Sequence, residues 1–184
     1  MEAVRRNAAY CLGVLVRISG PALVPHYMAI LQSLHPLCTR PVEQMGADKG
    51  GADVDNALSA VAYMVKTDLN AMKMVLPQVL PAMLAALPLR SDQSEGPNVY
   101  GCLVELLLGG DPTTQSQLPE VLRVFGDVLS PDSSAEPEAK ERIVLCIRTL
   151  AGSPQSQGAL AAALGQVTSP TARAAVETTI MANA

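Results

Sequence analysis

The stretch VRRNAAYCLGVL, residues 4–15, explains how the rest of the chain is organised. Its apolar residues recur at spacings of three and four, which places them on one face of an amphipathic helix. The same layout returns in DNALSAVAYMV at 55–65 and in PNVYGCLVELL at 97–107, and more faintly in ERIVLCIRTL at 141–150. The chain is therefore expected to repeat one helical unit.

The copies follow one another at a nearly constant interval. Aligned on Asn7, Asn56, Asn98 and Arg142, they are 49, 42 and 44 residues apart. A HEAT-type unit of two helices takes about 40–47 residues. The interval predicts an all-α fold, a right-handed α-solenoid of about four HEAT-type helical hairpins, the last of them degenerate.

Each hairpin is expected to consist of a helix A followed by a helix B. The four hairpins are predicted over 2–38, 53–88, 95–130 and 136–182, in a single HEAT-repeat fragment covering 1–184. The predicted helices are 2–18, 22–38, 53–68, 71–88, 95–108, 115–130, 136–151, 154–164 and 171–182. The loop over 39–52 is polar, glycine-rich and long, so it is either a mobile surface segment or a contact element.

A proline recurs near the start of each helix B, at Pro25, Pro77 and Pro119. Proline suits the first turn of a helix but costs about 3 kcal/mol in the interior. The second helix B is therefore expected to begin close to Val75, or to kink at Pro81.

The first helix A is predicted to carry apolar residues on two sides. Val4, Ala8 and Leu12 would face both its own helix B and the place where another repeat would pack. We therefore expect an unusually apolar surface on this helix. The same pattern suggests that the chain is the C-terminal piece of a longer solenoid.

Composition limits the kinds of core and partner. Apolar residues make up 49% of the chain and aromatic residues only 3%, so Leu, Val, Ala, Ile and Met must form a helical core. The net charge is -4 and no basic run occurs, which argues against direct nucleic-acid binding. No uncharged apolar run approaches the length of a membrane span, about 20 residues.

The four cysteines are expected to be buried free thiols in a reducing compartment rather than disulfides. They lie far apart, and no pair has the CxxC spacing of a zinc or redox site. They are Cys11, Cys38, Cys102 and Cys146.

No set of residues predicts catalysis, a metal or a cofactor. His26 and His35 are the two histidines, and along a helix they would be about 13–14 Å apart, too far to share a metal. The Gly109-Gly110 pair has no strand before it, so a helix-to-helix turn is favoured over a phosphate loop. The chain is predicted not to be an enzyme.

The three aligned asparagines, Asn7, Asn56 and Asn98, lie near the starts of their A helices. If the repeats stack in register, these side chains form a row. One hypothesis is a structural ladder of polar contacts between neighbouring repeats. The alternative is local support of the first turn of each helix.

Carboxylates gather in the inter-helix loops and on the exposed side of the B helices. They are Asp48, Asp53, Asp55, Asp92, Glu95, Glu120, Asp127, Asp132, Glu136 and Glu138. They either solvate the turns or form an acidic rim that attracts a partner rich in lysine and arginine. The candidate cargo-binding residues are Gln78, Asp92, Glu95, Glu120, Arg123 and Asp127.

RNAAYCLGVL at 6–15, followed by Asp55-Asn56-Ala57, resembles the C-terminal HEAT repeats of the importin-beta (karyopherin-beta) nuclear transport receptors, especially the importin-four type. The segment LPLRSD at 87–92 and the helix after Glu95 fit the same place. The resemblance covers most of the chain and is strongest over 5–130.

The resemblance implies a protein-binding, non-enzymatic part of a nuclear import receptor that works in cytoplasm and nucleus. Its B helices would line a concave surface for basic cargo such as histones or ribosomal proteins. Its neighbours would be preceding HEAT repeats, and the GTPase Ran would bind through N-terminal repeats that this chain lacks. The alternative is a HEAT-repeat scaffold subunit of a multiprotein assembly.

Overall fold

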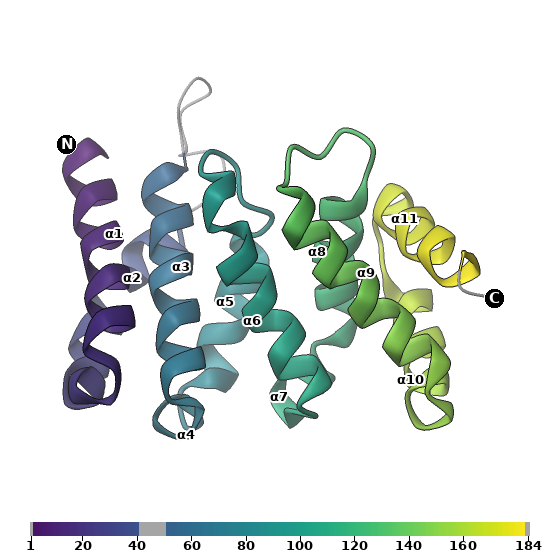
Figure 1. Ribbon diagram of the computed structural model, residues 1–184, viewed down its shortest axis with the longest axis horizontal. Coiled ribbons are helices and arrows are strands. Elements are labelled where there is room, and N and C mark those ends of the chain that lie inside the picture. Colours follow the sequence, from purple (N-terminus) through teal and green to yellow (C-terminus); the bar gives the residue numbers. More distant parts are fainter. Residues whose placement is uncertain (1, 41–50, 183–184) are drawn as a thin grey trace. The chain divides into compact units, whose positions relative to one another are not determined.

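The computed structural model describes residues 2–40 and 51–182, and all regular structure in these residues is helical (Figure 1). The elements are α1 (Glu2–Ser19), η1 (Gly20–His26), α2 (Tyr27–Cys38), α3 (Ala52–Thr67), α4 (Leu69–Met72), α5 (Leu76–Ala86), η3 (Gln93–Glu95), α6 (Gly96–Leu108), α7 (Pro112–Ser116), α8 (Leu118–Leu129), α9 (Pro137–Gly152), α10 (Pro154–Gln166) and α11 (Pro170–Met181). The predicted all-α class is confirmed, while the handedness and the number of hairpins stay predictions. Most of the predicted loop over 39–52 lies outside the described residues.

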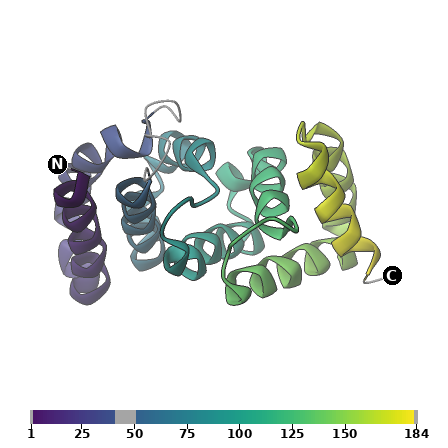
Figure 2. The ribbon, with the colours of Figure 1, turned by 90° about the horizontal axis from the view of Figure 1, so that it is seen from above.

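The chain divides into two compact units, Met1–Cys102 and Leu103–Ala184, which we call the N-terminal and C-terminal units. In the N-terminal unit, α1 lies along α3, and α2 packs against α3 and α5 (Figure 2). Small residues bring α1 and α3 together: a methyl group at Gly13 would lie 3.4 Å from the Cα atom of Ala60. This close approach lets the two helices share one buried seam.

The second helix of the first hairpin begins later than the sequence predicts. Residues 22–26 belong to the 3₁₀ helix η1, and α2 starts at Tyr27. Pro21 and Pro25 both lie in η1 and have no N–H to donate, which disfavours a continuous α-helical ladder. Gly20 before them has φ 53, a left-handed conformation that glycine adopts without strain.

The predicted starts of the other B helices follow the prolines closely. Helix α5 begins at Leu76 with Pro77 in its first turn, which confirms the expected start near Val75. Helix α8 begins at Leu118 with Pro119 in the same place. The prediction of one helix over 115–130 is wrong, because residues 112–116 form a separate short helix, α7.

Short helices α4 and α7 precede α5 and α8, and each is capped by an aspartate. The Asp68 carboxylate accepts a hydrogen bond from the Ala71 amide at 2.9 Å. The Asp111 carboxylate accepts one from the Thr114 amide at 2.8 Å. Such caps satisfy amides that the first turn of a helix leaves unpaired.

The core is aliphatic, with Tyr100 and Phe125 fully buried. Met64 and Met83 are buried as expected. Met72 is also buried, whereas Met74 is 86% exposed.

The prediction that all four cysteines are buried is wrong for Cys11, which is exposed on α1. Cys38, Cys102 and Cys146 are buried free thiols. Burial raises the pKa of Cys38 and of Cys146 to about 12, so these thiols stay protonated at neutral pH.

One face of α1 is exposed and apolar, as the sequence predicts, but of the three residues named in that prediction Leu12 is only partly exposed. Val4 is 68% exposed and Ile18 is 75% exposed, and Leu15 between them is half-exposed. Together with the exposed Ala8 and Cys11, they recur at spacings of three and four. We call these five residues the α1 stripe.

The region Ala3–Cys38 is long and apolar enough to cross a membrane by composition alone, with a mean hydropathy of 1.4 over 18 residues. A single region of this kind is weak evidence, because helices of soluble proteins and signal sequences meet the same criterion. Here the region comprises α1, η1 and α2, with two prolines in η1 between the helices.

In the C-terminal unit, α8 packs most closely against α11, and α9 and α10 also pack against α8. Gly126 on α8 makes this packing possible, because a Cβ there would overlap the backbone carbonyl of Ala172 on α11. Arg173 on α11 also donates to the Val167 carbonyl at 2.6 Å. The glycine is therefore required by helix packing.

Gly126→Ala is expected to lower the free energy of unfolding by about 1–3 kcal/mol, because the added methyl group must displace a neighbouring backbone. Gly158→Ala on α10 is the matched control, since no atom lies within 4 Å of its Cβ position. That change should be neutral or should stabilise by up to about 1 kcal/mol. Urea denaturation measures both, and equal effects would contradict the packing role.

Candidate functional site

The first turn of α3 holds a fully buried carboxylate, Asp53. It accepts hydrogen bonds from Arg5 Nε at 2.9 Å and from both terminal nitrogens of Arg40 at 3.0 and 2.9 Å. Arg5 belongs to α1 and Arg40 follows α2, so one carboxylate joins three segments. Burial opposes ionisation, but the guanidinium hydrogen bonds outweigh it and lower the pKa of Asp53.

Asp55, two residues further along the same helical turn, anchors a different segment. Its carboxylate accepts backbone hydrogen bonds from Arg90 at 3.1 Å, Ser91 at 2.7 Å and Asp92 at 2.8 Å. Burial raises the pKa of Asp55, although the three amides favour its charged form. The hypothesis that Asp53 and Asp55 belong to an exposed acidic rim is therefore wrong, since both are buried and bonded.

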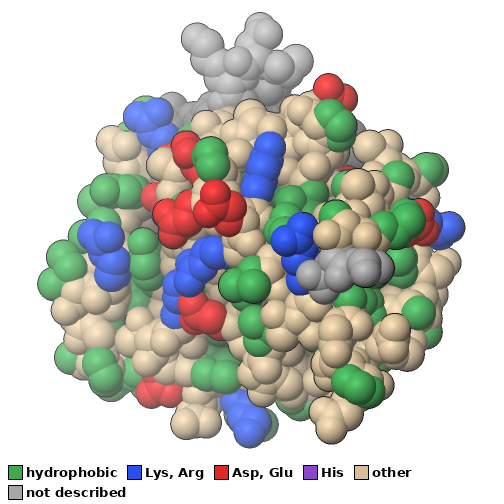
Figure 3. Space-filling view, turned by 45° about the vertical axis from the view of Figure 1, so that its right-hand side comes forward, with side chains coloured by type: hydrophobic (Ala, Val, Ile, Leu, Met, Phe, Trp, Pro, Cys, Tyr) green, Lys and Arg blue, Asp and Glu red, His purple; other side chains and the backbone are tan. Residues whose placement is uncertain are grey.

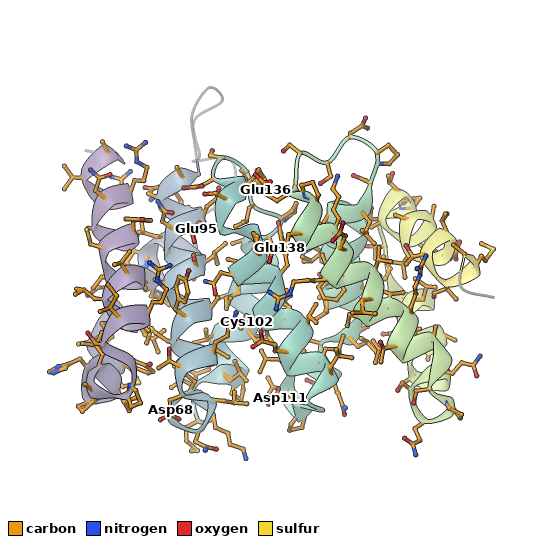
Figure 4. All side chains as sticks on the ribbon, in the orientation of Figure 1. Asp68, Glu95, Cys102, Asp111, Glu136 and Glu138 are labelled. Atoms are coloured by element: carbon orange, nitrogen blue, oxygen red, sulfur yellow. The ribbon has the colours of Figure 1, made fainter. Side chains whose placement is uncertain are left out.

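The segment anchored by Asp55 leads into η3 and places Glu95 against α3 (Figure 4). Ser59 on α3 donates its hydroxyl hydrogen to the Glu95 carboxylate. The same hydroxyl oxygen accepts a hydrogen bond from the Asn98 carboxamide at 2.9 Å. A chain of polar contacts thus runs from α6 through α3 to η3.

The three aligned asparagines have three different environments. Asn98 also donates to the Ser59 carbonyl at 3.0 Å, which is the kind of contact that the ladder hypothesis proposes. Asn56 is 3% exposed, and its carboxamide oxygen is buried without a hydrogen-bond partner. Asn7 is exposed, and its oxygen accepts from Arg6 on the same helix at 3.4 Å. Equivalent sequence positions do not make equivalent contacts.

A polar pocket of about 180 Å³ lies between α1, α3 and η3, and we call it the α1–α3 pocket. Asn56, Ser59 and Glu95 contribute polar atoms to its wall. Its other lining residues are Tyr10, Gly13, Val14, Arg17, Tyr63 and Ser94. The Arg17 guanidinium lies over the Tyr63 ring, 5.8 Å from its centroid.

An apolar groove of about 320 Å³ lies between α2 and α5, and we call it the α2–α5 groove. The candidate residue Gln78 lines it, next to Val79 and opposite Met28 and His35. No Asp, Glu, Lys or Arg is among the residues that line it. Its chemistry suits an uncharged apolar group better than a cation.

The candidate residues of the C-terminal unit form one ion-pair cluster on α8. Arg123 Nε lies 2.8 Å from the Glu120 carboxylate, and another Arg123 nitrogen lies 3.0 Å from Asp127. The cluster carries one positive and two negative charges, so its field is weaker than two free carboxylates would produce. Figure 3 likewise shows acidic and basic side chains interspersed on one face, without a large field of one sign.

A hollow of about 460 Å³ in the C-terminal unit is lined by leucines, hydroxyls and amides, including Leu107, Thr149 and Ser153. No charged residue lines it. Within 2–40 and 51–182, no group of three or more His, Cys, Asp or Glu side chains could hold a metal ion.

The structure therefore distributes the predicted site residues over separate surfaces. Gln78 lies in the α2–α5 groove, Glu95 in the α1–α3 pocket, and Asp92 beside the pocket, where it accepts from Ser94. Sequence reasoning did not connect Tyr10, Arg17, Asn56 and Tyr63 with Glu95. No local signal could have done so, because the pocket arises only where α1 packs on α3.

Comparison with known proteins gives three informative relatives, while no protein-family model matches the chain. The "Probable importin subunit beta-4" of Schizosaccharomyces pombe is 32% identical over 127 residues, 69% of this chain and 11% of that protein. "Importin-4" of Homo sapiens is 30% identical over 165 residues, 89% of this chain and 14% of that protein. "Importin-4" of Mus musculus is 30% identical over 80% of this chain. The chain thus spans a small part of these relatives' length.

Asp53→Asn is expected to lower the free energy of unfolding by about 2–4 kcal/mol, because it leaves Arg40 without its buried partner. Arg40→Gln should cost more than Arg5→Gln, since Arg40 is 16% exposed and Arg5 is 45% exposed. The Asp53 pKa is lowered in the fold, so its stabilisation is complete above about pH 3.8 and is lost as the pH falls through the lower folded value.

Urea titrations of the original chain and of Asp53→Asn over a pH series measure this effect. The difference between their unfolding free energies should be largest near neutral pH and should shrink in acid. A difference that grows as the pH falls would contradict the role assigned to Asp53.

Proposed function

Because the chain belongs to the importin-4-like group of the importin-beta family, we propose that it is the C-terminal, protein-binding part of a nuclear import receptor. The observation that carries this proposal is the similarity to "Importin-4" of Homo sapiens over 89% of the chain. The helical architecture supports it, since stacked helix pairs offer extended surfaces for proteins. The receptor would shuttle between cytoplasm and nucleus and would not act as an enzyme.

We propose that its cargo is basic, of the histone or ribosomal-protein class. Glu120 is half-exposed and Asp127 is 27% exposed, so each can still meet a cation from solvent while it pairs with Arg123. Asp92 and Glu95 offer further carboxylates in the N-terminal unit. These charges would steer a lysine- and arginine-rich segment toward the chain.

Apolar contacts would then hold the cargo. The α2–α5 groove offers Met28, which is 54% exposed, and methionine adapts to partners of varied shape. Gln78 at the groove can hydrogen-bond a peptide main chain. A suitable cargo segment would therefore combine basic residues with an uncharged apolar one.

The α1 stripe would be the contact surface for preceding HEAT repeats of a longer receptor. Its residues have the spacing that packs one helix against another, yet they are exposed on this chain. Ran would bind through other, N-terminal repeats of that receptor.

A HEAT-repeat scaffold subunit is the second candidate, and the uncharged α2–α5 groove favours it. A folded partner seated on such a surface would bind through apolar area, with little dependence on salt. Cargo steered by carboxylates would instead lose affinity steeply as the salt concentration rises.

Glu120→Lys with Asp127→Lys should weaken binding of a fluorescent lysine- and arginine-rich peptide by about tenfold, because it reverses the charge of the α8 cluster. Fluorescence anisotropy at low and physiological salt measures this. Glu141→Lys with Glu177→Lys reverses as many charges, on α9 and α11 and outside the candidate residues, and is the matched control. Equal losses in both variants, or salt-independent binding, would favour the scaffold.

Cys11 tests the role of the α1 stripe without changing the sequence. Iodoacetamide should alkylate Cys11 quickly in this chain and leave the buried Cys38 and Cys146 unmodified. In a longer receptor chain with further repeats before α1, Cys11 should become protected. Mass spectrometry after timed labelling measures the rates, and equal Cys11 rates in both chains would exclude helix packing on the stripe.

A further inference from the structure

The α1–α3 pocket contains a hydrogen-bond acceptor that the fold does not use. Asn56 lines the pocket, is only 3% exposed, and has a buried carboxamide oxygen without a hydrogen-bond partner. A buried carbonyl oxygen without a donor costs about 1–3 kcal/mol. An N–H or O–H group that reached this oxygen from the pocket would remove that cost.

A second acceptor in the pocket is charged. Glu95 is partly exposed, and its carboxylate accepts a hydrogen bond from the Ser59 hydroxyl on α3. A carboxylate has about four lone-pair sites, so it retains capacity for further donors. The Ser59 hydroxyl oxygen also accepts a hydrogen bond from the Asn98 carboxamide. Asn56 and Glu95 thus present two oxygen acceptors, one neutral and one anionic, to the same small space.

Two tyrosine rings complete the wall, and one of them already contacts a cation. Arg17 places its guanidinium over the Tyr63 ring, whereas Tyr10 is 51% exposed. Aromatic faces attract cations, and arginine uses them more often than lysine. The contact made by Arg17 shows that a guanidinium fits against the Tyr63 ring in this wall.

From this arrangement we propose that the α1–α3 pocket binds one arginine side chain of a protein partner. The guanidinium would donate to the Glu95 carboxylate and to the Asn56 oxygen, and its plane would stack on a tyrosine ring. The volume of about 180 Å³ suits a single side chain rather than a peptide segment. This inference rests on the proposed function, because it names the side chain of the basic partner that enters this pocket.

The geometry favours arginine over other ligands for two reasons. A guanidinium has several donors in one plane and is weakly hydrated, so it can satisfy both acceptors at little desolvation cost, whereas an ammonium is a compact, strongly hydrated charge. An anion would be repelled by the Glu95 carboxylate and would offer no donor to the Asn56 oxygen. Arg17 competes with the incoming arginine, because its own guanidinium occupies the Tyr63 ring.

Fluorescence anisotropy with two labelled glycine–serine peptides tests the proposal on the full chain, one peptide carrying two arginines and the other two lysines. The arginine peptide should bind more tightly. Glu95→Gln should weaken it by about tenfold, the loss of one charge-assisted hydrogen bond. Arg17→Gln should strengthen it severalfold, because the competing cation is removed. Arg17 is exposed, so this variant should fold, and circular dichroism verifies both variants.

The outcomes separate the pocket from the proposed function. If Glu95→Gln and Arg17→Gln leave peptide affinity unchanged while charge reversal at Glu120 and Asp127 lowers it, the arginine-pocket proposal is wrong and the proposed function stands. Equal affinity for the two peptides, or weaker binding after Arg17→Gln, would also overturn the arginine assignment. If neither peptide binds at low salt, the pocket and the basic-cargo proposal both fail.

Discussion

The N-terminal unit depends on a buried negative charge in the first turn of α3. Asp53 has no exposed surface, so its charge is tolerated only because Arg5 and Arg40 bond to it. These two hydrogen-bonded ion pairs fix the start of α1 and the residues after α2 close to the start of α3. Two residues later, Asp55 imposes the same requirement on the backbone of 90–92. One helical turn thus determines where four segments of the unit meet.

This structural use of carboxylates limits what the chain can offer to a partner. Asp53 and Asp55 are buried and hydrogen-bonded within the fold, and Glu120 and Asp127 both form ion pairs with Arg123. The acidity of the composition is therefore a poor guide to the acidity of the surface. A basic partner of the proposed kind would therefore be attracted by only a few partly paired carboxylates, and such interactions are sensitive to salt.

Anchoring of the segment at 90–92 also explains why a polar pocket exists at all. The segment delivers Glu95 to α3, and the small residues along the α1–α3 seam bring Tyr10 and Arg17 close to Asn56. The pocket is polar where the neighbouring α2–α5 groove is apolar. The N-terminal unit therefore offers a partner one polar and one apolar surface.

Much of the fold could be predicted from local sequence. The interval between the repeated stretches indicates helix pairs, and Pro77 and Pro119 mark the starts of α5 and α8 because a proline is favourable only in a first turn. The sequence does not predict the 3₁₀ segment Gly20–His26, because each of its prolines, Pro21 and Pro25, is equally compatible with the first turn of an α-helix. The exposed face of α1 followed directly from its periodicity.

The candidate site could be predicted only in part, because its contacts join residues far apart in the chain. The sequence by itself determined the helical repeat, the aliphatic core and the presence of carboxylates near the start of α3. Only the tertiary structure decided that Asp53 meets Arg5, 48 residues away, and that Asp55 meets Asp92, 37 residues away. Helix periodicity is a local property, whereas the partner of a buried charge depends on which segments pack together.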